Sequence, residues 1–225
     1  MDITEAARIL QQFCSQDLTN TLAEIETSAK GLTSKSCPAA LAACGAREEV
    51  LVAAGLVKKL AGQINVIMHA SGILTCLPKI LEPDEVVQYL SLGAGNTGRA
   101  FDLETNKRIA EFKFIYWRGA DAIRQNSLFK DFYRLAEHPT PKRKYVYVLG
   151  TEYPLKFLNG RRAIASVLDK YAALLDRFRA IHGNQYETVR DYYQARGNQV
   201  ILQDVSLWVN GLVADGIDET EPPNA

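Results

Sequence analysis

The sequence predicts an α/β fold with a helical N-terminal extension, because its hydrophobic pattern changes near residue 80. Before that point, apolar residues recur with the period of amphipathic helices. After it, short β-branched and aromatic runs alternate with turns and helical segments. With 225 residues, 47% hydrophobic and 23% charged, the chain has the size and composition of one globular domain with additions.

The N-terminal part is expected to be helical. Residues 3–30 and 38–81 follow helical patterns, separated by a polar loop rich in Ser, Thr and Lys. Three glycines are candidate breaks in the second pattern: Gly45, Gly55 and Gly62. Residues 1–55 form the extension in this interpretation.

Strands and further helices are expected after residue 81. The strand-like runs cover residues 86–92, 100–104, 109–117 and 144–149. Asp121 can cap a helix that ends at Ala136, and a last helix fits residues 160–181. The expected order is therefore α–β–β–β–α–β–α. Residues 56–182 would form the core, and residues 183–225 a C-terminal extension that ends in a disordered acidic tail.

Three charged residues in the second and third strands are the strongest functional signal, because burying a charge is costly. They are Asp102, Glu111 and Lys113. Side chains alternate along a strand, so Glu111 and Lys113 point to the same face. A two-residue turn at residues 106–107 places Asp102 directly opposite Glu111, with Cβ atoms about 4.5–5.5 Å apart. A turn shifted by one residue leaves the acids diagonal on one face, and a regular three-residue turn separates them unless a bulge intervenes.

Two opposed carboxylates repel each other unless a cation lies between them. Together with a backbone carbonyl and waters they suit Mg²⁺, which lowers the pKa of a bound water and neutralises charge on a phosphate. Lys113 could orient that water or stabilise the transition state. The structural alternative is a cross-strand ion pair between Asp102 and Lys113 on an exposed face.

The run from Phe101-Asp102 to Glu111-Phe112-Lys113 resembles the signature of the PD-(D/E)xK nuclease superfamily. The element order over residues 56–150 is also similar to that family's α–β–β–β–α–β core. The resemblance implies a restriction-endonuclease-like fold with a mixed sheet and a nuclease that requires Mg²⁺ or Mn²⁺ and acts on DNA rather than RNA. It also implies that Asp102 and Glu111 bind the metal and that Lys113 assists the attacking water.

The helix after the third strand agrees with this resemblance, since Gln125 and Lys130 resemble positions that face the active site or the nucleic-acid backbone. The residues assigned to substrate binding are Arg99, Arg124, Gln125 and Lys130. Residues 99–179 contain 17 Lys and Arg but 9 Asp and Glu, which a polyanionic partner would explain. Solvated, Arg-rich helix faces would give the same balance.

One departure from the family's pattern concerns the first core helix, because residues 56–81 contain no acid. The candidate substitutes are Gln63, His69, Glu48 and Glu49. The missing carboxylate favours one metal ion over two. The second hypothesis, from another functional class, is a non-catalytic nucleic-acid-binding or interaction protein that keeps the nuclease fold.

Residues 93–98 match the pattern G-x-G-x-x-G directly after a strand. A dinucleotide or adenosylmethionine site would need a helix to begin there. The following residues alternate and then turn, so the pattern favours a connection between strands whose backbone amides could approach a phosphate.

Reduced thiols and a cytoplasmic location are expected. The four cysteines lack Cys-x-x-Cys spacing, and the alternative is a zinc site that combines Cys14, Cys37, Cys44 and Cys76 with His69, His138 and His182. No secretory signal is visible. The longest apolar stretch, residues 50–81, is interrupted by polar residues, so neither a membrane span nor membrane binding is expected. The sequence leaves open whether the chain forms a homodimer.

Overall fold

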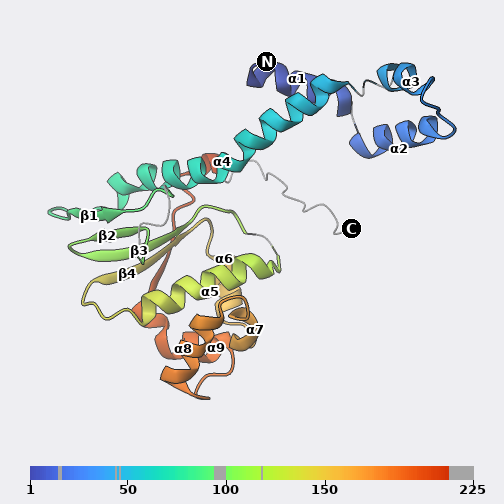
Figure 1. Cartoon of the computed structure of the whole chain (residues 1–225). Helices are drawn as coiled ribbons and strands as arrows, with labels where there is room; N and C mark the ends of the chain where they lie inside the picture. Colours follow the sequence, from blue (N-terminus) through green and yellow to red (C-terminus); the bar gives the residue numbers. More distant parts are fainter. Residues whose placement is uncertain (15–16, 44, 46, 94–99, 118, 213–225) are drawn as a thin grey trace. The chain divides into compact units, whose positions relative to one another are not determined.

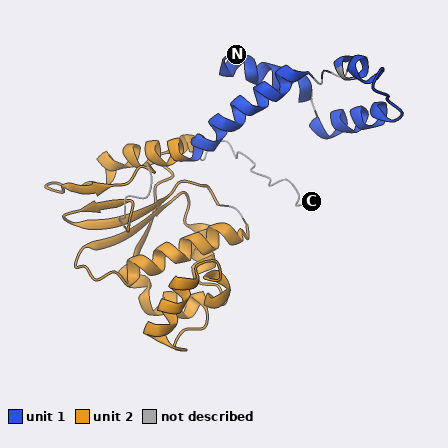
Figure 2. Cartoon of the chain, viewed as in Figure 1, with its two compact units in different colours: residues 1–65 blue, residues 66–225 orange. Residues whose placement is uncertain are grey.

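The computed structural model of the chain describes residues 1–14, 17–43, 45, 47–93, 100–117 and 119–212. It contains two compact units, residues 1–65 and residues 66–225 (Figure 2). The division falls inside the longest helix, α4 (Glu48–Ile80). The sequence predicts a boundary near residue 55. Helix α4 continues past this residue, so no turn in the sequence marks the position where the two units divide.

Unit 1 is helical, as expected. It contains α1 (Ile3–Cys14), α2 (Leu18–Ala29), α3 (Cys37–Ala43) and the first part of α4. The single helix expected over residues 3–30 is wrong, because Asp17 has extended backbone and caps a new helix with its carboxylate. Gly45 precedes α4 with a φ of 75°, whereas Gly55 and Gly62 lie inside α4 without interrupting it.

Helix α4 is long and apolar enough to cross a membrane, judged by length and composition alone. The expectation that no segment meets this criterion is therefore wrong. The C-terminal part of α4 packs on the sheet of unit 2, where Ile73, Cys76 and Ile80 are buried. Core helices of soluble proteins meet the same criterion, so the cytoplasmic location stays a prediction.

Unit 2 is built on a five-stranded mixed sheet (Figure 1). The strands lie side by side in chain order: β1 (Val87–Leu90), β2 (Leu103–Thr105), β3 (Arg108–Lys113), β4 (Arg143–Val148) and β5 (Ile201–Asp204). The first three are antiparallel neighbours, and β4 and β5 continue the sheet in parallel. Helix α5 (Ala122–Ala136) provides the connection that the parallel β3–β4 pair requires. The α/β class and the order α–β–β–β–α–β are confirmed.

Helices cover both faces of the sheet (Figure 1). On one face, Ala110 and Phe112 of β3 pack in a cluster with residues of α4. On the other face, Ile109 and Val146 pack with α5 and the C-terminal helices. These helices are α6 (Glu152–Leu158), α7 (Ile164–Val167), α8 (Ala172–His182) and α9 (Val189–Arg196). The strand alternation thus separates two cores, and the odd-numbered residues of β3 face α5.

The segment after β4 differs most from the expectation. The helix expected over residues 160–181 is wrong, because α7 and α8 are separate helices and the backbone of Tyr171 between them is not helical. Helices α6 and α9 and strand β5 were not expected. The C-terminal region also contributes to the core, since Val189 and Tyr192 are buried and β5 pairs with β4. The acidic tail lies outside the described residues.

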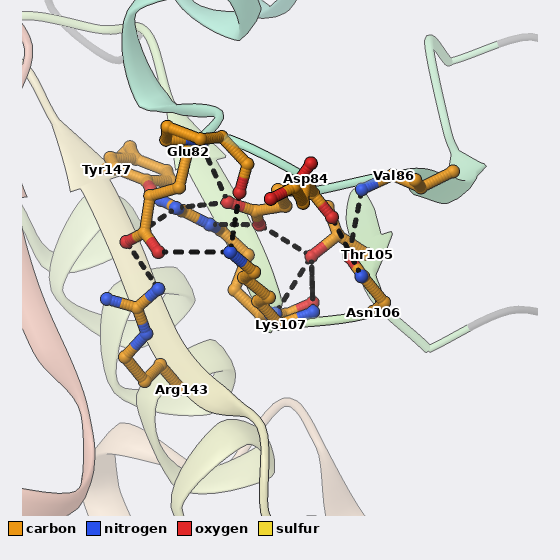
Figure 3. A network of polar contacts seen from close by, with 11 residues as sticks. Glu82, Asp84, Val86, Thr105, Asn106, Lys107, Arg143 and Tyr147 are labelled. Carbon is orange, nitrogen blue, oxygen red and sulfur yellow. Dashed lines mark hydrogen bonds and ion pairs between the residues drawn. The ribbon is translucent and has the colours of Figure 1, made fainter.

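A buried polar network anchors the turn between β2 and β3 (Figure 3). Arg108 donates to the carboxylate of Glu85 through Nε and Nη2, both at 2.5 Å, and through Nη1 to Tyr147 Oη at 2.8 Å. Thr105 Oγ1 donates to Glu85 at 2.6 Å and accepts from the N–H of Arg108 at 2.8 Å. Burial alone would raise the pKa of Glu85, but these hydrogen bonds lower it to about 2. The network fixes residues 106 and 107 as the turn, and with it the register of β3.

Candidate active site

The β2–β3 turn brings Asp102 beside Glu111. The register pairs Leu103 with Ala110 and Glu104 with Ile109, and Asp102 immediately precedes β2. Asp102 Oδ2 accepts a hydrogen bond of 2.9 Å from the N–H of Phe112, which holds its carboxylate against β3. The two-residue turn at residues 106–107 and the β2–β3 pairing predicted from the sequence are confirmed.

Glu111 is a buried acid with 7% of its surface exposed. Burial, followed by the negative charges of Asp131 and Asp102, raises the pKa of Glu111 to about 9. Even with the ammonium group of Lys113 nearby, this carboxyl group therefore holds a proton at neutral pH. A bound divalent cation would reverse that preference, because it stabilises the ionised form.

Asp102 is the ionised member of the pair. Burial opposes its ionisation, but His69 and the N–H of Phe112 hold the pKa of Asp102 below its ordinary value. His69 Nε2 lies 3.5 Å from Asp102 Oδ1. His69 belongs to α4, so it reaches Asp102 from the helix that packs on the sheet of unit 2. Of the substitutes named from the sequence, it is the one that unit 2 contains.

Lys113 extends the site from β3 to α5. Its ammonium group forms an ion pair with the carboxylate of Asp131, and Lys130 Nζ lies 3.2 Å from the other oxygen of that carboxylate. Burial favours the neutral amine, yet the charges of Asp131 and Glu111 raise the pKa of Lys113. The alternative of an exposed ion pair between Lys113 and Asp102 is therefore wrong, because Lys113 pairs with Asp131, a buried residue of α5.

Asp131 was missed from the sequence, although a signal was present. It is 2% exposed and lies in the buried stripe of α5, three residues after Leu128 and four before Leu135. A charged residue at a core position of an amphipathic helix requires a buried partner. That partner is on a strand, so it becomes visible only once α5 is packed on β3.

The substrate-binding residues named from the sequence do not gather in one place. Lys130 lies at the site, where it pairs with Asp131 and has its Nζ 5.4 Å from the ring centroid of Tyr171. Arg124 lies 2.5 Å from Asp121, the residue that caps α5, and Gln125 accepts a hydrogen bond of 2.6 Å from Arg162. Arg99 lies outside the described residues.

The donor set fits a hard cation in chemical type. Asp102 and Glu111 offer carboxylate oxygens, and the pKa of Glu111 is raised by burial first and then by the charges of Asp131 and Asp102. Among the described residues, however, no three His, Cys, Asp or Glu side chains form a metal-binding group. Any ion would therefore need water or backbone oxygens to complete its coordination.

The other sequence patterns do not build a second catalytic site within the described residues. The zinc alternative finds no support there, since Cys76 is buried in the α4 core while His182 packs beside Phe178 and Tyr192. Residues 94–99 of the glycine-rich pattern are not described. The described residues that follow, from Ala100 on, form bends and then β2, so no helix follows the pattern there.

None of the protein-family models, curated proteins or solved structures compared with the chain matches it.

Proposed function

We propose that unit 2 is a metal-dependent nuclease of the PD-(D/E)xK type that hydrolyses phosphodiester bonds, with DNA as its substrate. The observation that carries this proposal is the closeness of Asp102, Glu111 and Lys113: Asp102 accepts from the N–H of Phe112, between Glu111 and Lys113 on β3, and its charge acts on both neighbours. Two buried acids beside each other destabilise a folded protein. A role in binding a cation accounts for keeping them together.

Asp102 and Glu111 would hold Mg²⁺ or Mn²⁺. When bound, such an ion supplies Lewis acidity toward a phosphate and lowers the pKa of a bound water. His69 keeps Asp102 ionised and oriented from the side of α4.

Lys113 contributes a fixed positive charge. Because its pKa is raised, it is protonated at neutral pH and serves as a hydrogen-bond donor to the attacking water or to a phosphate oxygen, rather than as a general base. Asp131 is a positioning residue, since it acts on the reaction through the ion pair that holds Lys113.

The arrangement of unit 2 supports a restriction-endonuclease-like topology. In the antiparallel part of the sheet, β3 carries Glu111 and Asp102 directly precedes β2. Helix α5 leads to the parallel strand β4, and α4 and α5 lie on opposite faces. The excess of basic residues between residues 99 and 179 supports a polyanionic substrate.

A non-catalytic nucleic-acid-binding or interaction protein is the second candidate. The ion pair between Lys113 and Asp131 favours it, because this contact gives the lysine a structural partner without a substrate. The two candidates differ in one respect. In the nuclease, Glu111 is required for cleavage, whereas the second candidate does not cleave nucleic acid.

The deciding experiment is a cleavage assay with Mg²⁺ or Mn²⁺ on linear, circular and single-stranded DNA and on RNA. We expect metal-dependent cleavage that is lost in Glu111→Gln and Lys113→Ala. Glu104→Gln is the matched control, since Glu104 lies two residues after Asp102 but pairs with Lys142 at 2.8 Å. Cleavage that survives in both site variants, or that never occurs, would remove the catalytic proposal.

A further inference from the structure

A pocket separate from the acidic pair opens where the chain leaves β3. It encloses about 330 Å³ and is lined by Trp117, by Gln125 of α5, by Tyr153 and Lys156 of α6, and by Arg161 and Arg162. This volume lies at the lower end of the range of pockets that bind small molecules, about 300–1,000 Å³. The pocket therefore has room for a ligand the size of a single nucleotide.

The charged residues that line the pocket are all basic within the described part of the chain. They are Lys156, Arg161 and Arg162. Arg162 is held in place by its hydrogen bond to Gln125 at 2.6 Å. Lys156 and Arg161 are exposed, and neither has an ion pair or side-chain hydrogen bond within the described part of the chain. Their charges are available to an anion.

Aromatic residues form another part of the lining. The indole Nε1 of Trp117 donates to the carbonyl of Gly119 at 2.9 Å, which fixes the ring, and the Trp117 and Phe157 centroids are 5.9 Å apart. Trp117 and Phe157 are each 6% exposed, so the half-buried Tyr153, which lines the same pocket, offers most of the ring surface that a base can reach. Aromatic side chains stack on unpaired bases, and arginines pair with phosphate oxygens. The combination suits a ligand with both an aromatic ring and a phosphate.

The pocket is connected to the acidic pair by two short stretches of chain. Trp117 follows Lys113 by four residues. Gln125 precedes Asp131 by six residues on α5, which corresponds to about 9 Å along the helix axis. One short stretch of a nucleic-acid strand could therefore reach both places.

We propose that this pocket binds one unstacked nucleotide, with its phosphate on Lys156 and Arg161 and its base against the aromatic lining. The ligand is a phosphorylated nucleoside in either of two forms, a free mononucleotide or a nucleotide of a DNA strand. The strand form rests on the proposed nuclease function, whereas the nucleotide chemistry does not. Gln125, expected from the sequence to contact substrate, takes the role of positioning Arg162 at this pocket.

The test is calorimetric titration of the Glu111→Gln protein in EDTA, so that no cleavage interferes. We expect dAMP to bind more tightly than inorganic phosphate or deoxyadenosine alone. The double variant Lys156→Glu and Arg161→Glu should weaken dAMP binding by at least about tenfold. Lys170→Glu, an exposed charge reversal away from the pocket, is the control and should leave binding unchanged.

A 5′-phosphorylated oligonucleotide that binds more tightly than dAMP identifies a strand as the ligand, and equal affinity identifies the free nucleotide. The proposal is overturned if the double variant binds dAMP as the parent protein does, or if a phosphotyrosine peptide binds in preference to dAMP. Nucleotide binding without any cleavage by the wild-type protein would remove the nuclease function alone. Cleavage by the wild-type protein without nucleotide binding would overturn only the proposal that the pocket binds a nucleotide.

Discussion

Lys113 on β3 and Asp131 on α5 form an ion pair across the interface between the sheet and its helix. The Asp131 carboxylate is 2% exposed, so it is screened from water. Its charge acts on two neighbours in opposite directions, since it raises the pKa of Lys113 and also raises the pKa of Glu111. Asp131 thereby helps to keep Lys113 charged, and it adds to the effect of burial that keeps Glu111 protonated.

Replacing Asp131 by Asn should therefore change the site in a specific way. We expect a loss of about 3 kcal/mol in the free energy of unfolding, because a buried ion pair loses one partner. Cleavage should decrease mainly in kcat, because Lys113 is no longer held in place. Urea denaturation and steady-state kinetics over a range of pH measure the two effects. An unchanged pH profile together with full kcat would show that Asp131 does not position Lys113.

Replacing Glu111 by Gln should stabilise the metal-free protein at alkaline pH. The pKa of Glu111 is about 9 in the folded protein against an ordinary value of 4.5, so the folded state binds the extra proton between these limits. The unfolding free energy of the wild-type protein should consequently fall as pH rises from about 4.5 to about 9. At pH 8 in EDTA we expect the variant to be more stable by at least about 1 kcal/mol.

The matched comparison is Glu104→Gln, measured at pH 5 and pH 8 by urea denaturation. Addition of Mg²⁺ should stabilise the wild-type protein and not the Glu111→Gln variant, since the ion favours the ionised carboxylate. Equal stability of the wild-type protein and the Glu111→Gln variant at both pH values would contradict the raised pKa of Glu111. A Mg²⁺ response retained in the variant would show that the ion binds elsewhere.

The pairing of β2 with β3 could be proposed from the sequence because some of its determinants are local. A two-residue turn and the alternation of β3 are properties of neighbouring residues, and they leave only a few registers open. The contacts of Arg108 with Glu85 and Tyr147, which are distant in the sequence, select one of them. Asp131 and His69 could not be assigned with the same certainty, because each reaches the site from a helix whose rotation depends on packing. The role of a polar residue on a buried stripe requires its partner.

The C-terminal part was predicted less well for a related reason. Helices α7 and α8 share one continuous hydrophobic pattern. The backbone at Tyr171 between them is not helical, but no Gly or Pro marks this break in the sequence. Strand β5 covers four residues, Ile201–Asp204, too few for an alternation to stand out. Its place in the sheet comes from pairing with β4, which is a long-range contact.

Replacing Glu85 by Gln tests the network that fixes the β2–β3 turn. The pKa of Glu85 is about 2 in the folded protein against an ordinary 4.5, so the ionised group stabilises the fold at pH above 4.5. This stabilisation, about 3 kcal/mol, is lost as pH falls from about 4.5 to about 2. The variant should therefore lose stability at pH 7 and show a flatter acid-unfolding curve. Acid unfolding followed by circular dichroism measures the difference, and identical curves would exclude a role for Glu85 in acid stability.

Replacing Gly72 by Ala tests how closely α4 must approach the sheet. A Cβ atom at this position would lie 2.8 Å from the ring of Phe114, so either the helix or the ring must move. We expect a loss of about 1–3 kcal/mol in the free energy of unfolding. Because His69 lies one helical turn before Gly72, a shift of α4 should also displace His69 from Asp102 and lower the rate of cleavage.

Gly62→Ala is the matched control, since a Cβ there has no neighbour within 4 Å. It lies in the same helix and should stabilise the protein by about 0.5–1 kcal/mol through helix propensity. Thermal unfolding of the two variants, with the chemical shift of the His69 ring as a local probe, separates the helix effect from the packing effect. If Gly72→Ala is as stable as Gly62→Ala and leaves the His69 signal in place, the close contact between α4 and Phe114 is not needed to position His69.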